Sequence, residues 1–231
     1  MNSQVADRII VALDVATNQE GLKLASELSP HVGFFKIGLQ LYTAQGPGLA
    51  RAIPFLGPKV FLDLKLHDIP NTVAKTVEAA GKLSVKMLTI HLTGGSEMIR
   101  AAVDARPNDM LILGVTVLTS ADQGTLNEVG IADNIDNHVL RLAKLGVRAG
   151  IDGLVASPFE AKLLRAQFGD KIKIVTPGVR PSWSDAGDQK RFMTPRQAID
   201  AGADYLVIGR PITAHSNPRE AIVKILEELR D

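Results

Sequence analysis

Short apolar runs recur along the chain, and each is followed by a segment with helical spacing of its apolar residues. The runs consist almost entirely of Val, Ile, Leu, Phe and Met, which is typical of strands covered on both faces. The intervening segments, such as 18–28 and 71–83, are rich in helix formers. The sequence contains eight such runs, at residues 8–15, 32–38, 59–66, 86–93, 110–118, 153–157, 172–178 and 204–210.

This alternation of strand and helix predicts parallel strands joined by right-handed crossovers. Eight units predict a closed barrel, and the 231 residues are close to the usual length of about 250 for such barrels. We therefore predict an α/β fold, a single-domain (β/α)8 TIM barrel over residues 1–231. A doubly wound open sheet is the alternative.

Two connections are longer than the others, at residues 119–137 and 180–194. Both follow a predicted strand, so both are expected at the rim formed by the carboxyl ends of the strands. Long loops in compact domains usually carry function, and barrel enzymes keep their chemistry at this rim.

The charge balance limits the partners. Lys and Arg total 26 against 25 Asp and Glu, with no long basic run, so nucleic acid is not an expected partner. The chain has no cysteine, which fits a reducing compartment. The N-terminal run "IIVAL" ends at Asp14 and is too short for a signal-peptide core or a membrane span. We expect a soluble, cytoplasmic protein with no membrane partner.

Polar residues stand near the carboxyl end of every predicted strand. Each one alone could cap a helix or form a structural ion pair. In a closed barrel, however, these positions converge on one mouth, and their recurrence indicates a functional site. The residues are Asp14, Lys36, Asp63, Lys65, His91, Thr119, Ser157, Arg180 and Arg210.

The densest charges occur in "DLKLHD", residues 63–68. Side chains alternate along a strand, so Asp63 and Lys65 are expected to share the inner face, while Leu62, Leu64 and Leu66 point toward the helices. Together with Lys36 and Asp68, they permit an alternating array of charges. A buried ion-pair network is a weak source of stability, so a functional site is the better interpretation.

Two histidines, His67 and His91, raise the possibility of zinc or iron. No His-rich or Glu-rich spacing supports them as ligands, and we assign them hydrogen-bonding or packing roles. No metal is predicted.

The last strands indicate a phosphate site. Gly209 and Arg210 end the eighth run, and "TPGVR" ends the seventh. Backbone amides after these two strands commonly bind phosphate in barrels, and Arg adds charge. Gln189, in the long loop, could close over the same anion.

The chain resembles the orotidine 5′-monophosphate decarboxylase family. The specific signature is "DLKLHDIPNTV", and the similarity extends along the chain through "VALDV", "FKIGLQL", "VTVLTS", "TPGVRP" and "VIGRPI". The resemblance implies conversion of orotidine 5′-monophosphate (OMP) to UMP and CO2 in pyrimidine biosynthesis. It also implies a homodimer that needs no cofactor.

Site roles follow from the same resemblance. It implies that the ribose, the pyrimidine and the phosphate each have their own contacts, that a charged array does the chemistry, and that part of the array crosses the dimer interface. By this resemblance, Asp14 and Lys36 would contact the ribose, and Thr119 and Ser120 the pyrimidine. The phosphate would be bound by Arg180, Gln189, Gly209 and Arg210. The charged array would consist of Lys36, Asp63 and Lys65, and the residues that cross the interface would be Asp68, Ile69 and Thr72. Residues 180–194 would form the closing lid.

Two other functions stay open. A decarboxylase acting on 3-keto-gulonate 6-phosphate shares the D-x-K-x-x-D pattern but uses magnesium with an acidic residue on the second strand. This chain has Lys36 there, and a cation would repel magnesium. A catalytically silent nucleotide-binding barrel is the other alternative, because the fold alone does not fix function.

Overall fold

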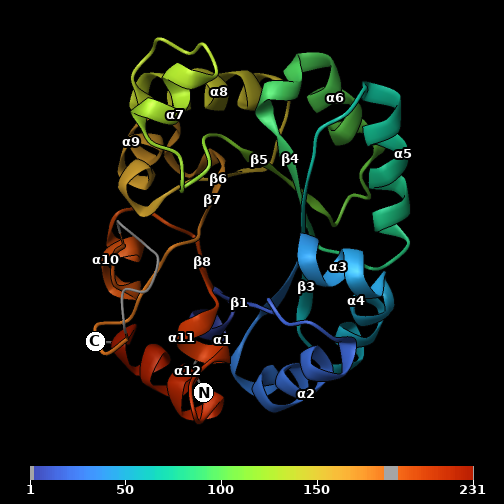
Figure 1. Cartoon of the computed structure of the whole chain (residues 1–231), viewed down its shortest axis with the longest axis vertical. Coiled ribbons are helices and arrows are strands. Elements are labelled where there is room, and N and C mark those ends of the chain that lie inside the picture. The colour runs from blue at the N-terminus through green and yellow to red at the C-terminus, as the bar shows by residue number, and fades with distance from the viewer. Residues whose placement is uncertain (1–2, 185–191, 231) are drawn as a thin grey trace.

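A computed structural model describes residues 3–184 and 192–230, which form a closed barrel of parallel strands inside a ring of helices (Figure 1). The strands pair in chain order, and β8 pairs with β1 to close the sheet. The predicted (β/α)8 barrel is confirmed, and the open sheet is wrong. That one domain spans residues 1–231 stays a prediction. The strands are β1 (Ile9–Ala12), β2 (Phe34–Gly38), β3 (Lys59–Leu66), β4 (Met87–His91), β5 (Leu111–Val115), β6 (Gly153–Val155), β7 (Lys173–Thr176) and β8 (Tyr205–Ile208).

Helices follow the strands and pack against the outside of the barrel. Several begin at a side-chain cap: Thr17 and Glu20 form a reciprocal capping box at the start of α2, and Ser157 and Glu160 do so at α9. The α-helices are α1 (Ser3–Ala6), α2 (Asn18–Leu28), α3 (Leu39–Gln45), α4 (Gly48–Ala52), α5 (Pro70–Gly81), α6 (Gly95–Ala105), α7 (Gln123–Glu128), α8 (Ile135–Arg148), α9 (Pro158–Phe168), α10 (Pro195–Asp200), α11 (Arg210–Thr213) and α12 (Pro218–Glu228). Short 3₁₀ turns are η1 (Ser29–His31), η2 (Ile53–Leu56), η3 (Leu92–Gly94) and η4 (Gly169–Lys171).

The period-two alternation of the strands divides the apolar residues between two cores. One face of each strand joins the helices in a large outer core, which includes Val11, Leu62 and Ile90. The other face fills the barrel interior with a separate cluster. Its buried members are Ile10, Ala12, Phe34, Phe61, Met87, Leu113, Val175 and Val207. The barrel is therefore packed through its middle, and space for a ligand remains at its mouth.

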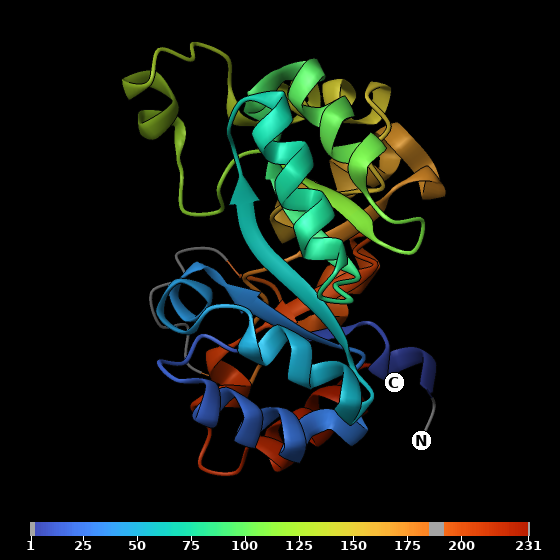
Figure 2. The same ribbon diagram turned by 90° about the vertical axis from the view of Figure 1, so that its right-hand side faces the viewer.

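The rim departs from the prediction in one connection. Residues 119–137 were expected to form a long loop, yet they contain α7 and the start of α8. Asp122 caps α7 by accepting a hydrogen bond from the backbone N–H of Thr125. Figure 2 shows α7 projecting from the barrel beyond the neighbouring helices. Within residues 3–184 and 192–230, no helix is long and apolar enough to cross a bilayer.

Candidate active site at the mouth of the barrel

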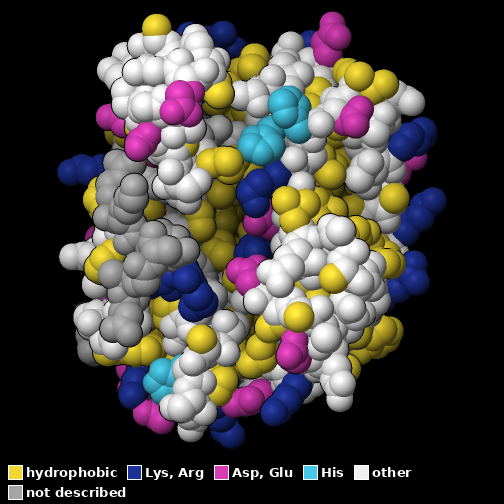
Figure 3. Space-filling model, viewed as in Figure 1, with side chains coloured by type: hydrophobic (Ala, Val, Ile, Leu, Met, Phe, Trp, Pro, Cys, Tyr) yellow, Lys and Arg dark blue, Asp and Glu magenta, His cyan; other side chains and the backbone are white. Residues whose placement is uncertain are grey.

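A cavity of about 370 Å³ opens at the carboxyl ends of the strands. Its floor is apolar, with Phe61, Val155 and Val207 among the residues that line it. Figure 3 shows this central hollow, with hydrophobic side chains on its wall and acidic and basic side chains meeting beside it. The volume and the mixture of an apolar wall with a few polar groups are those of a small-molecule site.

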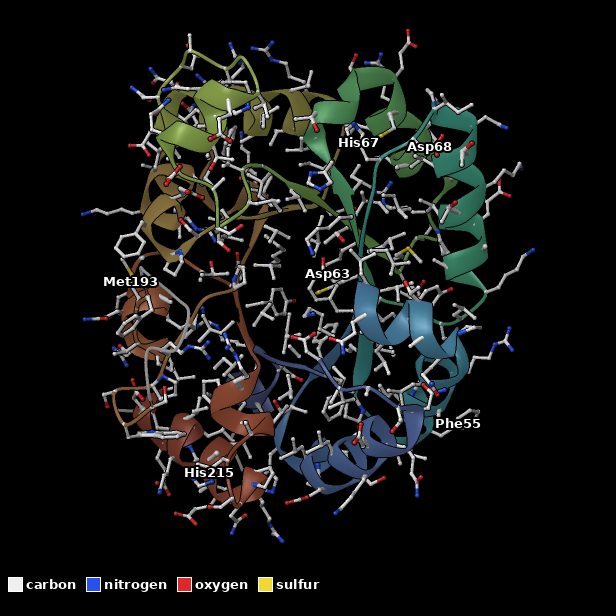
Figure 4. All side chains as sticks on the ribbon, viewed as in Figure 1. Phe55, Asp63, His67, Asp68, Met193 and His215 are labelled. Carbon is white, nitrogen blue, oxygen red and sulfur yellow. The ribbon has the colours of Figure 1, made fainter. Side chains whose placement is uncertain are left out.

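Asp63 and Lys65 lie side by side on the β3 wall of this cavity. The Lys65 ammonium donates to both carboxylate oxygens of Asp63, at 2.9 Å each. The Asp63 side chain is only 14% exposed, and in Figure 4 it points toward the middle of the barrel. The predicted pairing of these two residues on the inner face is confirmed.

Lys36 connects Asp63 to a second carboxylate. It lies on β2 and is buried, and its ammonium is 3.0 Å from Asp14 Oδ1 and 3.7 Å from Asp63 Oδ2. The charges alternate from Asp14 through Lys36 and Asp63 to Lys65, so every cation has a carboxylate partner. Mutual pairing holds these charges in place and makes the pocket wall polar at fixed points.

The backbone of Lys65 departs from the regular strand that its spacing predicts. Its φ is +51°, in the left-handed region that a lysine rarely adopts. The pairing of β3 with β4 also shifts, because four steps from Leu62 to Leu66 match only two steps from Leu88 to Ile90. This bulge re-aims the Lys65 side chain within the cavity, and strained backbone of this kind often marks a functional site.

Two imidazoles lie above the charged wall. The rings of His67 and His91 are 5.7 Å apart, and the pKa of His91 is lowered by burial and then by His67 and Lys65. A neutral imidazole beside the Lys65 ammonium avoids adding another positive charge. Among the described residues, no three His, Cys, Asp or Glu side chains are grouped to hold a metal ion.

The opposite wall of the cavity is formed after β7 and β8. Pro177, Gly178 and Arg180 line it on one side, and Gly209 and Arg210 on the other. Gly178 has a φ of +76°, which glycine adopts without strain, and this turn brings the backbone to the cavity. Arg180 is only 6% exposed. Two guanidinium groups and close backbone make this wall suited to a phosphate.

The remaining predicted residues divide into two groups. Thr119 lines the cavity, whereas Ser120 is exposed and does not. Ser157 caps α9, so the structural explanation holds for it. Gln189 lies outside the described residues, as does the whole of 185–191 within the proposed lid.

Three predicted residues between the end of β3 and the first turn of α5 do not line the cavity of their own chain. Asp68, Ile69 and Thr72 are exposed, and Ile69 is 66% so. Asp68 accepts a hydrogen bond from the backbone N–H of Ile69 at 2.7 Å, at the start of α5. Figure 4 shows Asp68 near that helix, well apart from Asp63.

Two features of this site were not predicted from the sequence. One is the left-handed backbone of Lys65, which no residue type at this position signals. The other is Thr89, whose hydroxyl donates to Asp63. Its position in the fourth run, two residues before His91, is a signal for the inner face.

Known proteins support this geometry along the whole chain. A sequence model of the orotidine 5′-phosphate decarboxylase / HUMPS family matches residues 7–225. The orotidine 5′-phosphate decarboxylase of Geotalea daltonii is 50% identical over 228 residues, which are 96% of this chain and 95% of that protein. The orotidine 5′-phosphate decarboxylase of Heliobacterium modesticaldum is 46% identical over 237 residues, which are 99% of this chain and 98% of that protein.

Solved structures agree with the sequence relatives. The crystal structure of the orotidine 5′-phosphate decarboxylase from Lactobacillus acidophilus has a TM-score of 0.85 and 37% identity, covering 97% of this chain and 100% of that one. The crystal structure of orotidine 5′-phosphate decarboxylase from Pyrococcus horikoshii has a TM-score of 0.80 at 25% identity, and it covers 96% of this chain and 99% of that one. With the match of sequence, fold and length, this chain belongs to the orotidine 5′-phosphate decarboxylase / HUMPS family.

Proposed function

We propose that this protein decarboxylates orotidine 5′-monophosphate to UMP and CO2, using its own side chains and no cofactor. The observation that carries the proposal is the Lys65 ammonium, bonded at 2.9 Å to both oxygens of Asp63 on a cavity wall that faces Arg180 and Arg210. A ligand with an anionic pyrimidine at one end and a phosphate at the other matches these two walls.

The difficult step is the loss of CO2 from pyrimidine C6. The bond to the carboxylate breaks and its electron pair stays on C6, where no adjacent carbonyl delocalises it. Such reactions demand about 20 kcal/mol of differential stabilisation or more. The Lys65 ammonium stabilises the growing charge and then gives its proton to C6. Lys65 is left neutral and regains a proton from solvent.

Asp63 has two roles in this scheme. It orients the Lys65 ammonium, and it lies beside the departing carboxylate, where the repulsion of like charges is greater before the reaction than after it. We give the larger weight to the preset charges, because a fixed array needs no reorganisation when the anion forms.

The other cavity residues bind the substrate. Asp14 and Lys36 hold the ribose hydroxyls, and Thr119, with Ser120, contacts the pyrimidine. Arg180, Gly209 and Arg210 bind the phosphate, with Gln189 as a further ligand. The phosphate is remote from the bond that breaks, so its binding energy serves to position the pyrimidine against Lys65.

The active form in this proposal is a homodimer. Asp68, Ile69 and Thr72 would complete the site of the partner subunit, and their exposure in the single chain supports this role. Mixing an Asp68→Ala protein with a Lys65→Ala protein tests it, since each hybrid dimer regains one complete site. If activity does not recover after verified subunit exchange, the shared site is wrong.

We also propose a cytoplasmic location, which fits the absence of cysteine from the sequence.

The assay that tests the function follows the absorbance of orotidine 5′-monophosphate after addition of purified protein and EDTA. We expect its loss with formation of UMP. Activity that requires added magnesium would favour the 3-keto-gulonate-phosphate type of decarboxylase, although the buried Lys36 occupies the position of its acidic residue. Binding of UMP without turnover would favour the silent barrel.

A further inference from the structure

Thr89 lies in the middle of β4 and is fully buried. It shares the inner face of the barrel with Met87, two residues earlier, which belongs to the interior cluster. Thr89 is therefore one layer above that cluster and directly below the mouth, on the strand that neighbours Asp63 and Lys65.

The hydroxyl of Thr89 bonds to both members of the charged pair. The backbone N–H of Lys65 donates to Thr89 Oγ1 at 2.8 Å, and Thr89 Oγ1 donates to Asp63 Oδ1 at 2.9 Å. A backbone N–H only donates and a carboxylate only accepts, so the single hydroxyl hydrogen points at Asp63. The direction of both hydrogen bonds is fixed.

The bulge in β3 explains why this hydroxyl is needed. Between the pairs Leu62–Leu88 and Leu66–Ile90, three residues of β3 lie opposite Thr89 alone. A regular ladder would offer the Lys65 N–H a backbone carbonyl, and here the side chain of Thr89 supplies the acceptor. A lysine keeps a φ of +51° only where its surroundings impose it.

We propose that Thr89 is a positioning residue that holds the backbone of Lys65 and the carboxylate of Asp63 at a fixed separation. The Lys65 ammonium also bonds to Asp63, so Thr89 closes a ring that fixes Lys65 at both its backbone and its side chain. Thr89 acts on the reaction through Lys65 and does not line the cavity itself. This inference rests on the proposed decarboxylase function.

The test is Thr89→Val, which keeps the shape and removes the hydroxyl, beside Thr89→Ser, which keeps the hydroxyl. We expect Thr89→Val to lower kcat for orotidine 5′-monophosphate by about 10- to 100-fold, because small misplacements of a reacting group have effects of this size. KM and the affinity for UMP should change little, since the binding residues are untouched. Thr89→Ser should restore most of kcat.

Thr116→Val is the matched control. Thr116 is also buried and directly follows β5. Its hydroxyl donates to the Val155 carbonyl at 3.4 Å and does not bond to the charged pair. It should keep the wild-type kcat. Melting curves verify that each variant folds. If the valine variant does not fold, Thr89→Cys replaces it, with the same expected loss of kcat and little change in KM.

Two results would overturn the inference separately from the function. A wild-type kcat in Thr89→Val removes the positioning role while the decarboxylase stands. A loss of kcat in Thr89→Ser and in Thr116→Val as large as that in Thr89→Val shows that only packing matters. If the wild-type protein does not decarboxylate orotidine 5′-monophosphate, the function fails first, and the inference fails with it.

Discussion

The two ends of the barrel use the same residue types for different purposes. At the mouth, Asp63 pairs with ammonium groups and a hydroxyl. At the amino-terminal end of the strands, Asp152 and Asp204 each precede a strand, and each accepts a hydrogen bond from the backbone of a neighbouring strand. Asp63 lines the cavity at the mouth, whereas Asp152 and Asp204 do not.

The base of the barrel repeats one arrangement. Asp204 Oδ2 accepts from the backbone N–H of Ile174 at 2.8 Å and from Arg165 at 2.5 Å. Asp152 does the same with Ile112 at 2.8 Å, and its partner is Arg106 at 3.1 Å. Each aspartate thus connects the start of its own strand to the preceding strand. It also binds an arginine at the end of the helix that leads into that preceding strand.

Because their hydrogen-bond partners differ, the aspartates at the base are expected to serve stability and those at the mouth to serve function. A carboxylate bonded to backbone and guanidinium is satisfied by the fold itself, so removing it leaves backbone donors unpaired. A carboxylate bonded to lysines at a cavity holds charge ready for a ligand, and a structure gains little stability from it. Substitutions at the two ends should therefore affect different measurements.

The largest expected effect is at the mouth, for Lys65→Ala. Without the ammonium, the C6 anion has neither its stabilising charge nor its proton donor, so kcat should fall by at least about 10⁴-fold. UMP binding, measured by calorimetry, should persist because the phosphate wall is intact. Turnover close to that of the wild type would remove Lys65 from the chemistry.

The next effect is at the base, for Asp204→Ala. The Ile174 N–H and Arg165 lose their acceptor, and the free energy of unfolding should fall by about 2–3 kcal/mol, less than for a fully buried pair because the Asp204 side chain is 25% exposed. For a chain of this size the melting temperature falls by roughly 4–10 °C, while kcat is retained.

Asp170→Ala is the control for that measurement. Asp170 also pairs with Arg165, at 3.3 Å, but it is fully exposed. Its removal should leave the melting temperature unchanged. Equal destabilisation by the two variants would mean that the backbone hydrogen bond to Asp204 contributes nothing special.

A smaller effect is expected at the phosphate wall, for Arg210→Ala. Loss of one charge-assisted contact should lower kcat/KM by about 10- to 100-fold, through both KM and kcat, because the phosphate contact also positions the pyrimidine. Arg196→Ala, which removes a surface partner of Asp200 on α10, is the control and should have no effect. An unchanged KM in Arg210→Ala would place the phosphate elsewhere.

The smallest effect concerns His31, near the base in η1. It is 2% exposed, neither ring nitrogen has a hydrogen-bond partner among the described residues, and burial and then Arg219 lower its pKa. The folded state favours the neutral ring, so this contribution to stability is complete above the unfolded pKa of about 6.5 and is lost as the pH falls below it.

His31→Leu should therefore flatten the fall in unfolding free energy between about pH 7 and pH 5. Urea denaturation at a series of pH values measures it. The slope should not vanish, because His138 also has a lowered pKa, caused first by burial. An unchanged slope would mean that His31 is not titrated by unfolding in this range.

The barrel and most of its mouth follow from local patterns. Eight apolar runs predict eight strands, and the sequence places Asp63 and Lys65 on one face because alternation is a local property. The fifth strand shows the limit: the apolar run continues to Leu118, yet β5 ends at Val115. Pairing with β6 ends there, and pairing depends on the neighbouring strand.

The bulge at Lys65 and the role of Thr89 depend on two strands at once, so no single run predicts them. The base aspartates could have been found, since "DGLV" and "DYLV" repeat an Asp directly before the sixth and eighth strands. The role proposed for the exposed Asp68 and Thr72 in a partner's site stays a prediction, because one chain does not determine an assembly.

The most direct test of the division between the two ends compares Asp63→Asn with Asp152→Asn, measuring kcat and melting temperature for both. We predict that Asp63→Asn lowers kcat by at least about 100-fold with an unchanged or higher melting temperature. Asp152→Asn should lower the melting temperature by several degrees and keep kcat. Loss of stability without loss of turnover in Asp63→Asn would contradict the account, because Asp63 would then be a structural residue like those at the base.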